Sequence, residues 1–376
     1  MWVPLVRHEL RRTLGVRLGR LFHSGWSGPP TELSLDLTRR CNHRCAMCLQ
    51  HRHGSPGGPK YPWYDPAREL TGQEWETFLE GVRHWKPVCT ITGGEPLLHA
   101  GFGQVVRASR RAGLMVQILT NGTLLADHAR ELVEQRVAVV IVSIDGPADV
   151  HDEIRATPGS FSRAIEGMRA LVEERRRARL AGPVIGVNCT IQKRNCGSLH
   201  RMLEVARNAG ADFLQFQHTI HDTVDNVTSH NELLSPTFCR EHGLNVVQPS
   251  IPVGEFYENG LEASDVDAMV DWVDRGLSVG ATPETCFLPS LPTNAWKKYY
   301  LEPNCPIPGR CDSPWIRLRV MPDGTVLPCL HIVAGNIRTE AVSGIWNGTT
   351  MRALRKIVQR GLLPGCARCC GRSFHT

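Results

Sequence analysis

A regular alternation of two kinds of segment between residues 32 and 217 constrains the fold most. Six short apolar runs, rich in β-branched residues, are separated by segments with helical periodicity. Strands that alternate with helices form a parallel sheet with right-handed crossovers. The pattern therefore predicts an α/β fold, either a partial (β/α)6 barrel or an open doubly wound sheet. The predicted strands are 32–38, 88–92, 115–120, 138–144, 184–191 and 212–217, and the predicted helices are 72–85, 102–113, 124–136, 160–179 and 197–209.

Two segments interrupt this alternation. Residues 49–68 are rich in Gly, Pro, His and aromatic side chains, and residues 218–260 are polar and irregular. Long loops are uncommon unless they are functional or disordered. Because barrel active sites lie at the C-terminal ends of the strands, we expect both segments to line or cover a site there. A helix is predicted to follow near 262–278.

The composition changes at residue 283, where Cys, Pro and Trp become dense. A hairpin is predicted at 315–328 around the turn Pro322-Asp323-Gly324. Trp315 and Trp346 are interpreted as core residues of this small region. The chain is thus predicted to have three parts: a basic amphipathic helix (1–30), an α/β domain (31–282) and a small cysteine-rich domain (283–376).

The N-terminal segment 2–22 has the pattern of a basic amphipathic helix that ends before Gly28-Pro29-Pro30. Its apolar stripe is expected to pack on the barrel. The alternative is weak contact with an anionic membrane surface, since the segment is also rich in arginine. No apolar stretch is long enough to span a bilayer. The stripe consists of Val3, Val6, Leu10, Leu14, Leu18 and Leu21.

The 14 cysteines are clustered rather than evenly spread. Three lie at 41–48, directly after the first predicted strand, and six lie between Cys305 and Cys370. Charged residues interrupt any N-terminal secretory signal, so we expect a cytoplasmic protein, in which clustered cysteines bind metal or do redox chemistry. The net charge of +6 is spread along the chain, and no nucleic-acid partner is expected. The scattered cysteines are interpreted as small buried apolar residues; these are Cys89, Cys189, Cys196, Cys239 and Cys286.

Cys41, Cys45 and Cys48 have the spacing Cys-x3-Cys-x2-Cys. Three thiolates this close together are able to hold three irons of a [4Fe–4S] cube and leave the fourth iron open to a small molecule. A structural zinc site is the alternative, with His43 or His51 as the fourth ligand.

This spacing, with Met47 before the last cysteine, resembles the signature of the radical S-adenosylmethionine (SAM) superfamily. The resemblance implies a partial (β/α)6 TIM-like barrel. It also implies that the open iron chelates SAM and that electron transfer yields a 5′-deoxyadenosyl radical. Gly93, Gly94 and Glu95 match the family segment that holds the SAM amino group. Glycines allow close backbone approach, and a carboxylate pairs with an ammonium.

Residues 142–155 (VSIDGPADVHDEIR) resemble the fourth-strand segment of the subfamily that has C-terminal auxiliary clusters. The resemblance implies that Ser143 reaches the SAM ribose and Arg155 the SAM carboxylate. The alternatives are an ordinary strand end for Ser143 and a surface ion pair for Arg155. Asp145 is interpreted as a turn former before Gly146.

The C-terminal cysteines resemble the auxiliary-cluster extension called SPASM, or its shorter form, twitch. One auxiliary [4Fe–4S] cluster is expected on Cys311, Cys329, Cys366 and Cys369. Four thiolates close such a cluster fully, although they also suit a zinc ribbon. Cys305 and Cys370 remain alternative ligands.

The resemblance implies a radical SAM enzyme, an oxidoreductase that abstracts a hydrogen atom from a small-molecule or peptide substrate. The auxiliary cluster would accept the substrate's electron, in dehydrogenation of a sugar or alcohol or in peptide modification. A flavodoxin- or ferredoxin-type protein would supply the first electron. The alternatives are a radical SAM methyltransferase or epimerase, or a noncatalytic iron–sulfur scaffold.

Overall fold

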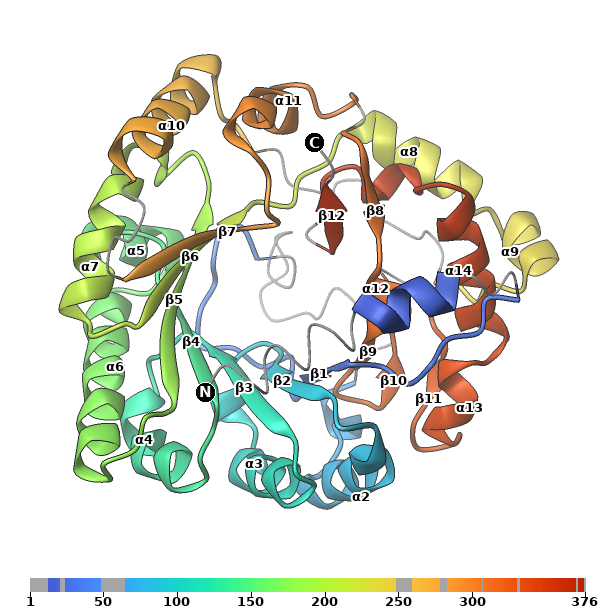
Figure 1. The fold of residues 1–376 in the computed structure, drawn as a ribbon, viewed down its shortest axis with the longest axis horizontal. Coiled ribbons are helices and arrows are strands. Elements are labelled where there is room, and N and C mark those ends of the chain that lie inside the picture. The colour runs from blue at the N-terminus through green and yellow to red at the C-terminus, as the bar shows by residue number, and fades with distance from the viewer. Residues whose placement is uncertain are drawn as a thin grey trace.

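The computed structural model describes residues 13–20, 24–48, 65–247, 259–277, 283–305, 307–329, 332–369 and 371–374. Six parallel strands pair in chain order at its centre. Figure 1 shows them curving as an arc with helices along its outer side, which confirms the partial barrel. The strands are β1 (Glu32–Asp36), β2 (Val88–Thr92), β3 (Met115–Thr120), β4 (Val139–Ser143), β5 (Val184–Ile191) and β6 (Phe213–His218).

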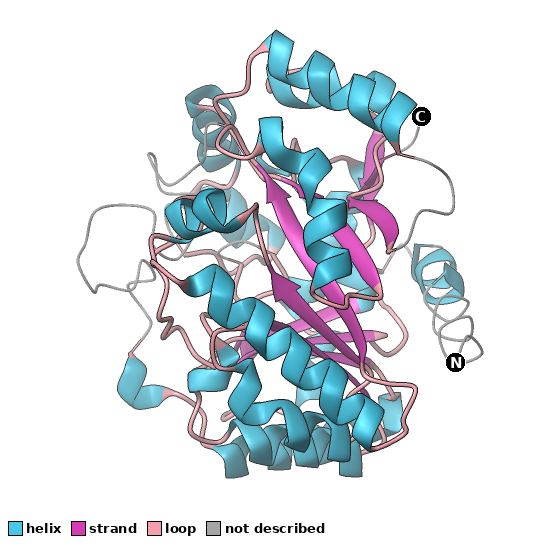
Figure 2. Ribbon diagram, turned by 90° about the vertical axis from the view of Figure 1, so that its left-hand side faces the viewer, coloured by secondary structure: helices cyan, strands magenta, loops and turns pink. Residues whose placement is uncertain are grey.

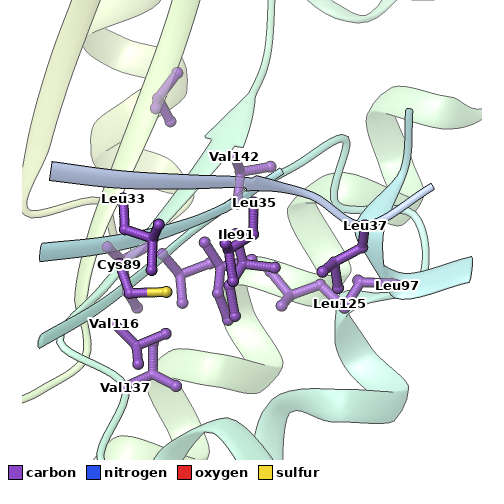
Figure 3. Close-up of a cluster of buried hydrophobic side chains, with 14 of the residues drawn as sticks. Leu33, Leu35, Leu37, Cys89, Ile91, Leu97, Val116, Leu125, Val137 and Val142 are labelled. Atoms are coloured by element: carbon purple, nitrogen blue, oxygen red, sulfur yellow. The ribbon is translucent and has the colours of Figure 1, made fainter. Parts of the chain in front are cut away.

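The helices between these strands cover the outer face of the sheet (Figure 2). They are α2 (Gly72–Val82), α3 (Phe102–Arg111), α4 (Leu125–Glu134), α5 (Ala148–Arg155), α6 (Ser160–Arg177) and α7 (Met202–Asn208). The main core forms where alternate strand residues meet the helices, as Leu33, Leu35 and Ile91 do in Figure 3. Cys89 lies in the same cluster and is fully buried, in line with its interpretation as an apolar residue.

The sheet continues beyond the six predicted strands at both edges. β7 (Glu284–Leu288) pairs parallel with β6, and β9 (Arg317–Val320) pairs parallel with β1. β10 (Thr325–Val326) and β11 (Gly335–Asn336) complete a ten-stranded sheet. The predicted hairpin is confirmed, because β9 and β10 are antiparallel and Gly324 between them has φ of 88°. The boundary at residue 283 stays a prediction, and the hydrogen-bonded sheet runs across it.

The prediction of one irregular loop over 218–260 is wrong for its first half. α8 (Val224–Leu233) and α9 (Pro236–His242) lie there. The Ser235 hydroxyl accepts the Phe238 N–H, and Gly243 ends α9 with φ of 71°. Ser235 and Gly243 are ordinary helix-capping residues. The helix was not predicted from the sequence because the surrounding segment is polar. Residues 248–258, and residues 49–64 of the other predicted loop, lie outside the described residues.

The N-terminal helix packs on the C-terminal part of the chain, so the expectation that its stripe packs on the barrel is wrong for the described residues 13–20. Val16 belongs to a second apolar cluster that includes Trp315, and Arg20 lies 4.6 Å from the centre of the Trp315 ring. Leu14 and Leu18 of the predicted stripe are 48% and 56% exposed. In Figure 1 this blue helix lies beside the C-terminal helices, away from α2–α7.

The other α-helices and strands lie after residue 262. They are α10 (Ala263–Gly276), α11 (Trp296–Leu301), β8 (Gly309–Cys311), α12 (Ser313–Ile316), α13 (Val342–Trp346), α14 (Thr349–Arg360) and β12 (Arg372–Phe374). β8 and β12 form a separate two-stranded antiparallel sheet. Trp315 and Trp346 are 1% and 2% exposed, as expected of core residues. Across the described ranges, we find no helix with the length and apolar character needed to cross a membrane.

Candidate active site and cysteine sites

The loop that carries Cys41, Cys45 and Cys48 is fixed by backbone hydrogen bonds on two sides. Arg44 and Ala46 donate their N–H groups to the carbonyls of Arg155 and Ile154, at 3.3 and 3.0 Å. The last carbonyls of a helix have no partner within it, so this loop satisfies two of those at the end of α5. The cysteine loop thereby lies against the segment that follows β4.

Gly93 and Gly94 hold the other side of this loop. The Gly94 N–H donates to the Thr38 carbonyl at 2.6 Å, and the Glu95 N–H donates to the Arg40 carbonyl at 2.8 Å. A Cβ on Gly94 would lie 2.2 Å from the Arg40 carbonyl oxygen, and one on Gly93 would lie 2.5 Å from that of Thr38. The glycines are therefore required by the close approach of the chain's own backbone next to Cys41.

Glu95 joins the end of β2 to the end of β3. It is fully buried and accepts hydrogen bonds from the Thr120 hydroxyl and the Asn121 N–H, both at 2.7 Å, and from the Leu97 N–H at 3.2 Å. Burial raises the pKa of Glu95 to about 7, against the effect of these donors. A nearby cation would stabilise the ionised carboxylate, which suits the ammonium expected from the resemblance.

Arg155 and Asp145 form a buried ion pair at the end of β4. The Arg155 Nη2 lies 2.6 Å from Asp145 Oδ2, and Arg155 Nη1 lies 3.6 Å from Cys45 Sγ. Asp145 is fully buried and also accepts the Thr190 N–H at 2.9 Å. The interpretation of Asp145 as a turn former is therefore incomplete, and the surface ion pair considered for Arg155 is instead a buried one. The local sequence identifies a turn before Gly146 but not the charge pairing.

The other predicted residues of this site lie around the same loop. Met47 is half-buried, and Ser143 is the half-buried last residue of β4, opposite Asn188 of β5. His43 is 1% exposed, and both of its ring nitrogens lack a hydrogen-bond partner among the described residues. His51 lies outside the described residues.

The thiols of the loop fit a cluster in their chemistry. Burial raises the pKa of Cys41 to about 12 and also raises that of Cys45, and the Cys48 thiol acts electrostatically on both. Thiolates in such surroundings need bound metal to stabilise their charge. Nowhere in the described ranges do three His, Cys, Asp or Glu side chains already converge as ligands of a single metal ion. A cube does not require this, because each thiolate binds a different iron.

A second thiol group lies in the C-terminal region. The Cys369 thiol acts electrostatically on Cys311, at the end of β8, and on Cys366, and Cys311 also acts on Cys366. Burial raises the pKa of Cys311 to about 11 and that of Cys366 to about 12. Cys329 packs against the same apolar cluster as Cys311 and Cys366, where its backbone forms a β-bridge with Ile332.

Of the alternative ligands, Cys305 is exposed, and its carbonyl accepts a hydrogen bond from Arg368. Cys370 lies outside the described residues. Of the scattered cysteines, Cys189 and Cys239 are buried as expected, whereas Cys196 is half-buried and Cys286 is exposed.

Sequence reasoning missed a pair of buried histidines where β6 ends. His218 and His221 are 0% and 3% exposed, and Nδ1 of His218 lies 2.6 Å from the Tyr300 hydroxyl. Burial lowers the pKa of His218 to about 3 and that of His221 to about 4. The only signal in the sequence was their position at the C-terminal end of a predicted barrel strand, where sites gather.

Two sequence profiles match the chain at separate places. The profile of the Radical SAM superfamily matches residues 35–188, and that of SPASM, an iron–sulfur cluster-binding domain, matches residues 311–370. Each range includes one of the two thiol groups. Together the two domains imply a [4Fe–4S] cluster, SAM and an auxiliary iron–sulfur cluster.

Similar proteins have diverse activities. The AdoMet-dependent heme synthase of Methanosarcina barkeri is 35% identical over 188 residues, which are 48% of each chain, so this chain spans about half the length of that relative. The tungsten-containing aldehyde ferredoxin oxidoreductase cofactor-modifying protein of Pyrococcus furiosus is 27% identical over 361 residues, 90% of this chain and 86% of that one.

Solved structures share the fold. SuiB of Streptococcus suis, bound to S-adenosylmethionine, superimposes with a TM-score of 0.60 at 12% identity, over 92% of this chain and 71% of that one. The architecture and both profiles therefore agree. This chain belongs to the radical SAM superfamily and carries a C-terminal SPASM auxiliary-cluster domain.

Proposed function

We propose that this enzyme uses SAM to remove a hydrogen atom from its substrate and that the net reaction is a two-electron oxidation. The observation that carries the proposal is the presence of two thiol groups of different kinds in one fold. One group has three thiols on a single loop, and the other draws four predicted ligands from distant segments. Three thiols leave an iron open to a ligand, whereas four leave an auxiliary cluster with redox chemistry only.

Cys41, Cys45 and Cys48 would hold the first cluster at the C-terminal end of β1. When bound, this cluster supplies the electron that converts SAM to methionine and a 5′-deoxyadenosyl radical, and the auxiliary cluster supplies an electron acceptor. The SAM site would be lined by Met47, Gly93, Gly94, Glu95, Ser143 and Arg155. The support for these roles is their position around the cysteine loop and the buried acceptors and donors that they offer.

The chain's own residues would keep this chemistry away from solvent. Glu95 and Asp145 are buried where β2 and β4 end, so these two carboxylates are shielded from water. The remaining predicted ligands, Cys311, Cys329, Cys366 and Cys369, would hold the auxiliary cluster. When the substrate radical loses a proton and an electron, this cluster would accept the electron.

The substrate would be a peptide or a small molecule. SuiB has been solved in complex with its precursor peptide SuiA, which supports a peptide for this fold. The heme synthase relatives support a small molecule. A flavodoxin- or ferredoxin-type protein would donate the electron for SAM cleavage.

A deuterium-labelling experiment tests the net reaction. With a substrate deuterated at the reacting carbon, deuterium should appear in 5′-deoxyadenosine, and the product should be two electrons more oxidised than the substrate. Cys329→Ala should reduce product formation more than SAM cleavage. A product isoelectronic with the substrate, or one that carries a methyl group from SAM, would contradict the oxidation and favour the epimerase or methyltransferase.

A further inference from the structure

A buried arginine lies directly beside the C-terminal thiol group. Arg372 and Cys311 are opposite one another in the antiparallel ladder of β8 and β12. Directly opposed residues place their side chains on the same face of such a ladder. The sheet therefore brings a guanidinium to the thiol of Cys311 from a segment far along the chain.

The guanidinium of Arg372 is fixed in position without a carboxylate. Its Nη1 donates to the carbonyls of Ala367 and Cys366 at 2.8 and 3.3 Å, and its Nη2 donates to that of Ile307 at 2.6 Å. Arg372 is 5% exposed, and its guanidinium carbon lies 4.6 Å from the centre of the Phe374 ring. These contacts hold the side chain in place, and no carboxylate of the described residues pairs with its positive charge.

One donor of Arg372 remains unused. Its Nε lacks a hydrogen-bond partner among the described residues. Leaving a buried charged donor without an acceptor is costly, so such a group indicates a missing acceptor. Burial lowers the pKa of Arg372, whereas the thiols of Cys366, Cys369 and Cys311 act in the opposite direction. The proposed cluster ligands are therefore, with Tyr299, among the groups whose negative charge would act on this guanidinium.

Arg368, four residues earlier, differs from Arg372 although it is equally buried. Its guanidinium donates to several carbonyls, most of them near the end of α11, among them those of Tyr299 at 2.7 Å and Glu302 at 2.6 Å. Cys305, rather than the proposed ligands, is the cysteine that acts electrostatically on Arg368. Arg368 therefore closes the C-terminus of α11, whereas Arg372 faces the thiols.

We propose that Arg372 is a positioning residue of the auxiliary cluster, which supplies a buried positive charge and an Nε–H donor to its sulfur atoms. This inference rests on the proposed function, because it concerns the cluster that would accept the substrate's electron. Hydrogen bonds to sulfur and nearby charge set the reduction potential of an iron–sulfur cluster. A fixed cation stabilises the reduced state more than the oxidised state, because reduction adds one negative charge. Arg372 would therefore raise the cluster's affinity for an electron.

The experiment isolates the auxiliary cluster in the full-length chain with Cys41, Cys45 and Cys48 replaced by Ala. Its midpoint potential is measured by redox titration followed by electron paramagnetic resonance. Arg372→Met should lower the midpoint by at least about 59 mV, which is a tenfold loss of affinity for one electron. Arg372→Lys keeps the positive charge but loses the Nε–H donor, so its midpoint potential should lie between those of the parent and Arg372→Met. Arg310→Met is the matched control, because exposed Arg310 precedes Cys311 on β8 and pairs with Asp312 at 2.9 Å.

Each other outcome has a defined meaning. If Arg372→Met keeps its cluster and has the midpoint of the parent, the proposal is wrong. If it loses iron while Arg372→Lys keeps it, the counter-charge is supported. If both lose iron while Arg310→Met keeps it, Arg372 has only a structural role and the proposal is overturned. If the parent with three alanines holds no cluster, the auxiliary site of the proposed function fails instead.

Discussion

The two thiol groups are built in different ways. Cys41, Cys45 and Cys48 lie on one loop, which is held by backbone hydrogen bonds to the C-terminal end of α5 and to the segment that follows β2. Cys311 and Cys366 come together only because β8 pairs with β12 and because the second apolar cluster forms. The first group depends on a local loop in a rigid barrel, whereas the second depends on contacts across the whole C-terminal region.

The charges beside the two groups differ as well. Arg155 lies near Cys45 but is paired with the buried carboxylate of Asp145 at 2.6 Å. Arg372 lies opposite Cys311, and its hydrogen bonds within the described ranges all go to backbone carbonyls. A neutralised pair suits a site that binds a charged ligand such as SAM, whereas an unneutralised cation suits one that stores an electron. The two sites should therefore respond differently to substitution.

The largest expected effect comes from removing the first group. The triple replacement Cys41→Ala, Cys45→Ala and Cys48→Ala should abolish SAM cleavage and leave about half of the iron, roughly four of eight atoms, because the second site is separate. Iron analysis of anaerobically purified protein measures this. Zinc in place of iron in the remaining site would contradict the auxiliary cluster.

Replacing a buried arginine of the C-terminal region should reduce iron binding by the C-terminal thiols more than iron binding by Cys41, Cys45 and Cys48. Arg355 is 0% exposed and donates to the carbonyls of Pro314, Trp346 and Gly25 at 2.8, 2.9 and 3.1 Å. Arg355→Met should destabilise this region by about 3 kcal/mol, because several buried carbonyls lose their donor. Chemical unfolding and iron analysis should show loss of auxiliary iron first.

The control for this change is Arg352→Met on the same helix. Arg352 is exposed and makes one side-chain hydrogen bond that the structure describes, to the Ser24 carbonyl at 3.0 Å. Its loss should cost about 0.5 kcal/mol. If Arg355→Met loses iron equally from both sites, the C-terminal region does not unfold separately from the barrel.

Acid should weaken the contact between the barrel and the C-terminal region. His218 of β6 lies 2.6 Å from Tyr300 of α11, and burial lowers the pKa of His218 to about 3. The unfolded chain, with a histidine pKa near 6.5, then binds the extra proton. Stability is thus full above about pH 6.5 and falls as the pH drops toward the folded value, by at most about 1.4 kcal/mol per pH unit for each such histidine.

His218→Gln should lower this slope by about a quarter, because three other buried histidines have similarly lowered pKa values: about 4 for His221, about 4 for His43 and about 3 for His151. Urea unfolding of the metal-free protein between pH 7.5 and 5 measures the slope. His200→Gln, at an exposed position, should keep the parent slope. An unchanged slope in His218→Gln would show that His218 is not a buried neutral histidine.

The smallest effect is expected at the N-terminal helix. Leu14 and Leu18 are exposed, while Val16 faces the second apolar cluster. We propose weak contact of the exposed leucines with an anionic membrane surface. Replacing both by Ser should reduce co-sedimentation with anionic vesicles about tenfold, because two apolar side chains that would insert into the membrane surface are lost. The unfolding midpoint of the protein should not change. Equal sedimentation of parent and variant would exclude this contact.

Local patterns predicted much of this structure. The six strands were identifiable because each is a short apolar run, and the hairpin because Pro322-Asp323-Gly324 demands a turn. The signals for α9 at Ser235 and Gly243 were also present but were overlooked in a polar segment. The motifs single out Cys41, Gly93 and Glu95 as predicted site residues.

Long-range pairing was not predictable from one sequence. Nothing local indicates that β9 pairs with β1 rather than forming a separate sheet, or that Arg372 lies opposite Cys311. Likewise Asp145 has the sequence context of a turn residue, and only the fold brings Arg155 to it. Such contacts depend on which surfaces remain uncovered once the barrel has formed.

Anaerobic reconstitution with iron and sulfide, followed by incubation with SAM and a strong reductant, tests the central claim most directly. We expect 5′-deoxyadenosine and methionine in equal amounts from the parent. We expect neither from the chain that lacks Cys41, Cys45 and Cys48. A parent that binds iron in both sites yet forms no 5′-deoxyadenosine would contradict the account and favour a noncatalytic iron–sulfur scaffold.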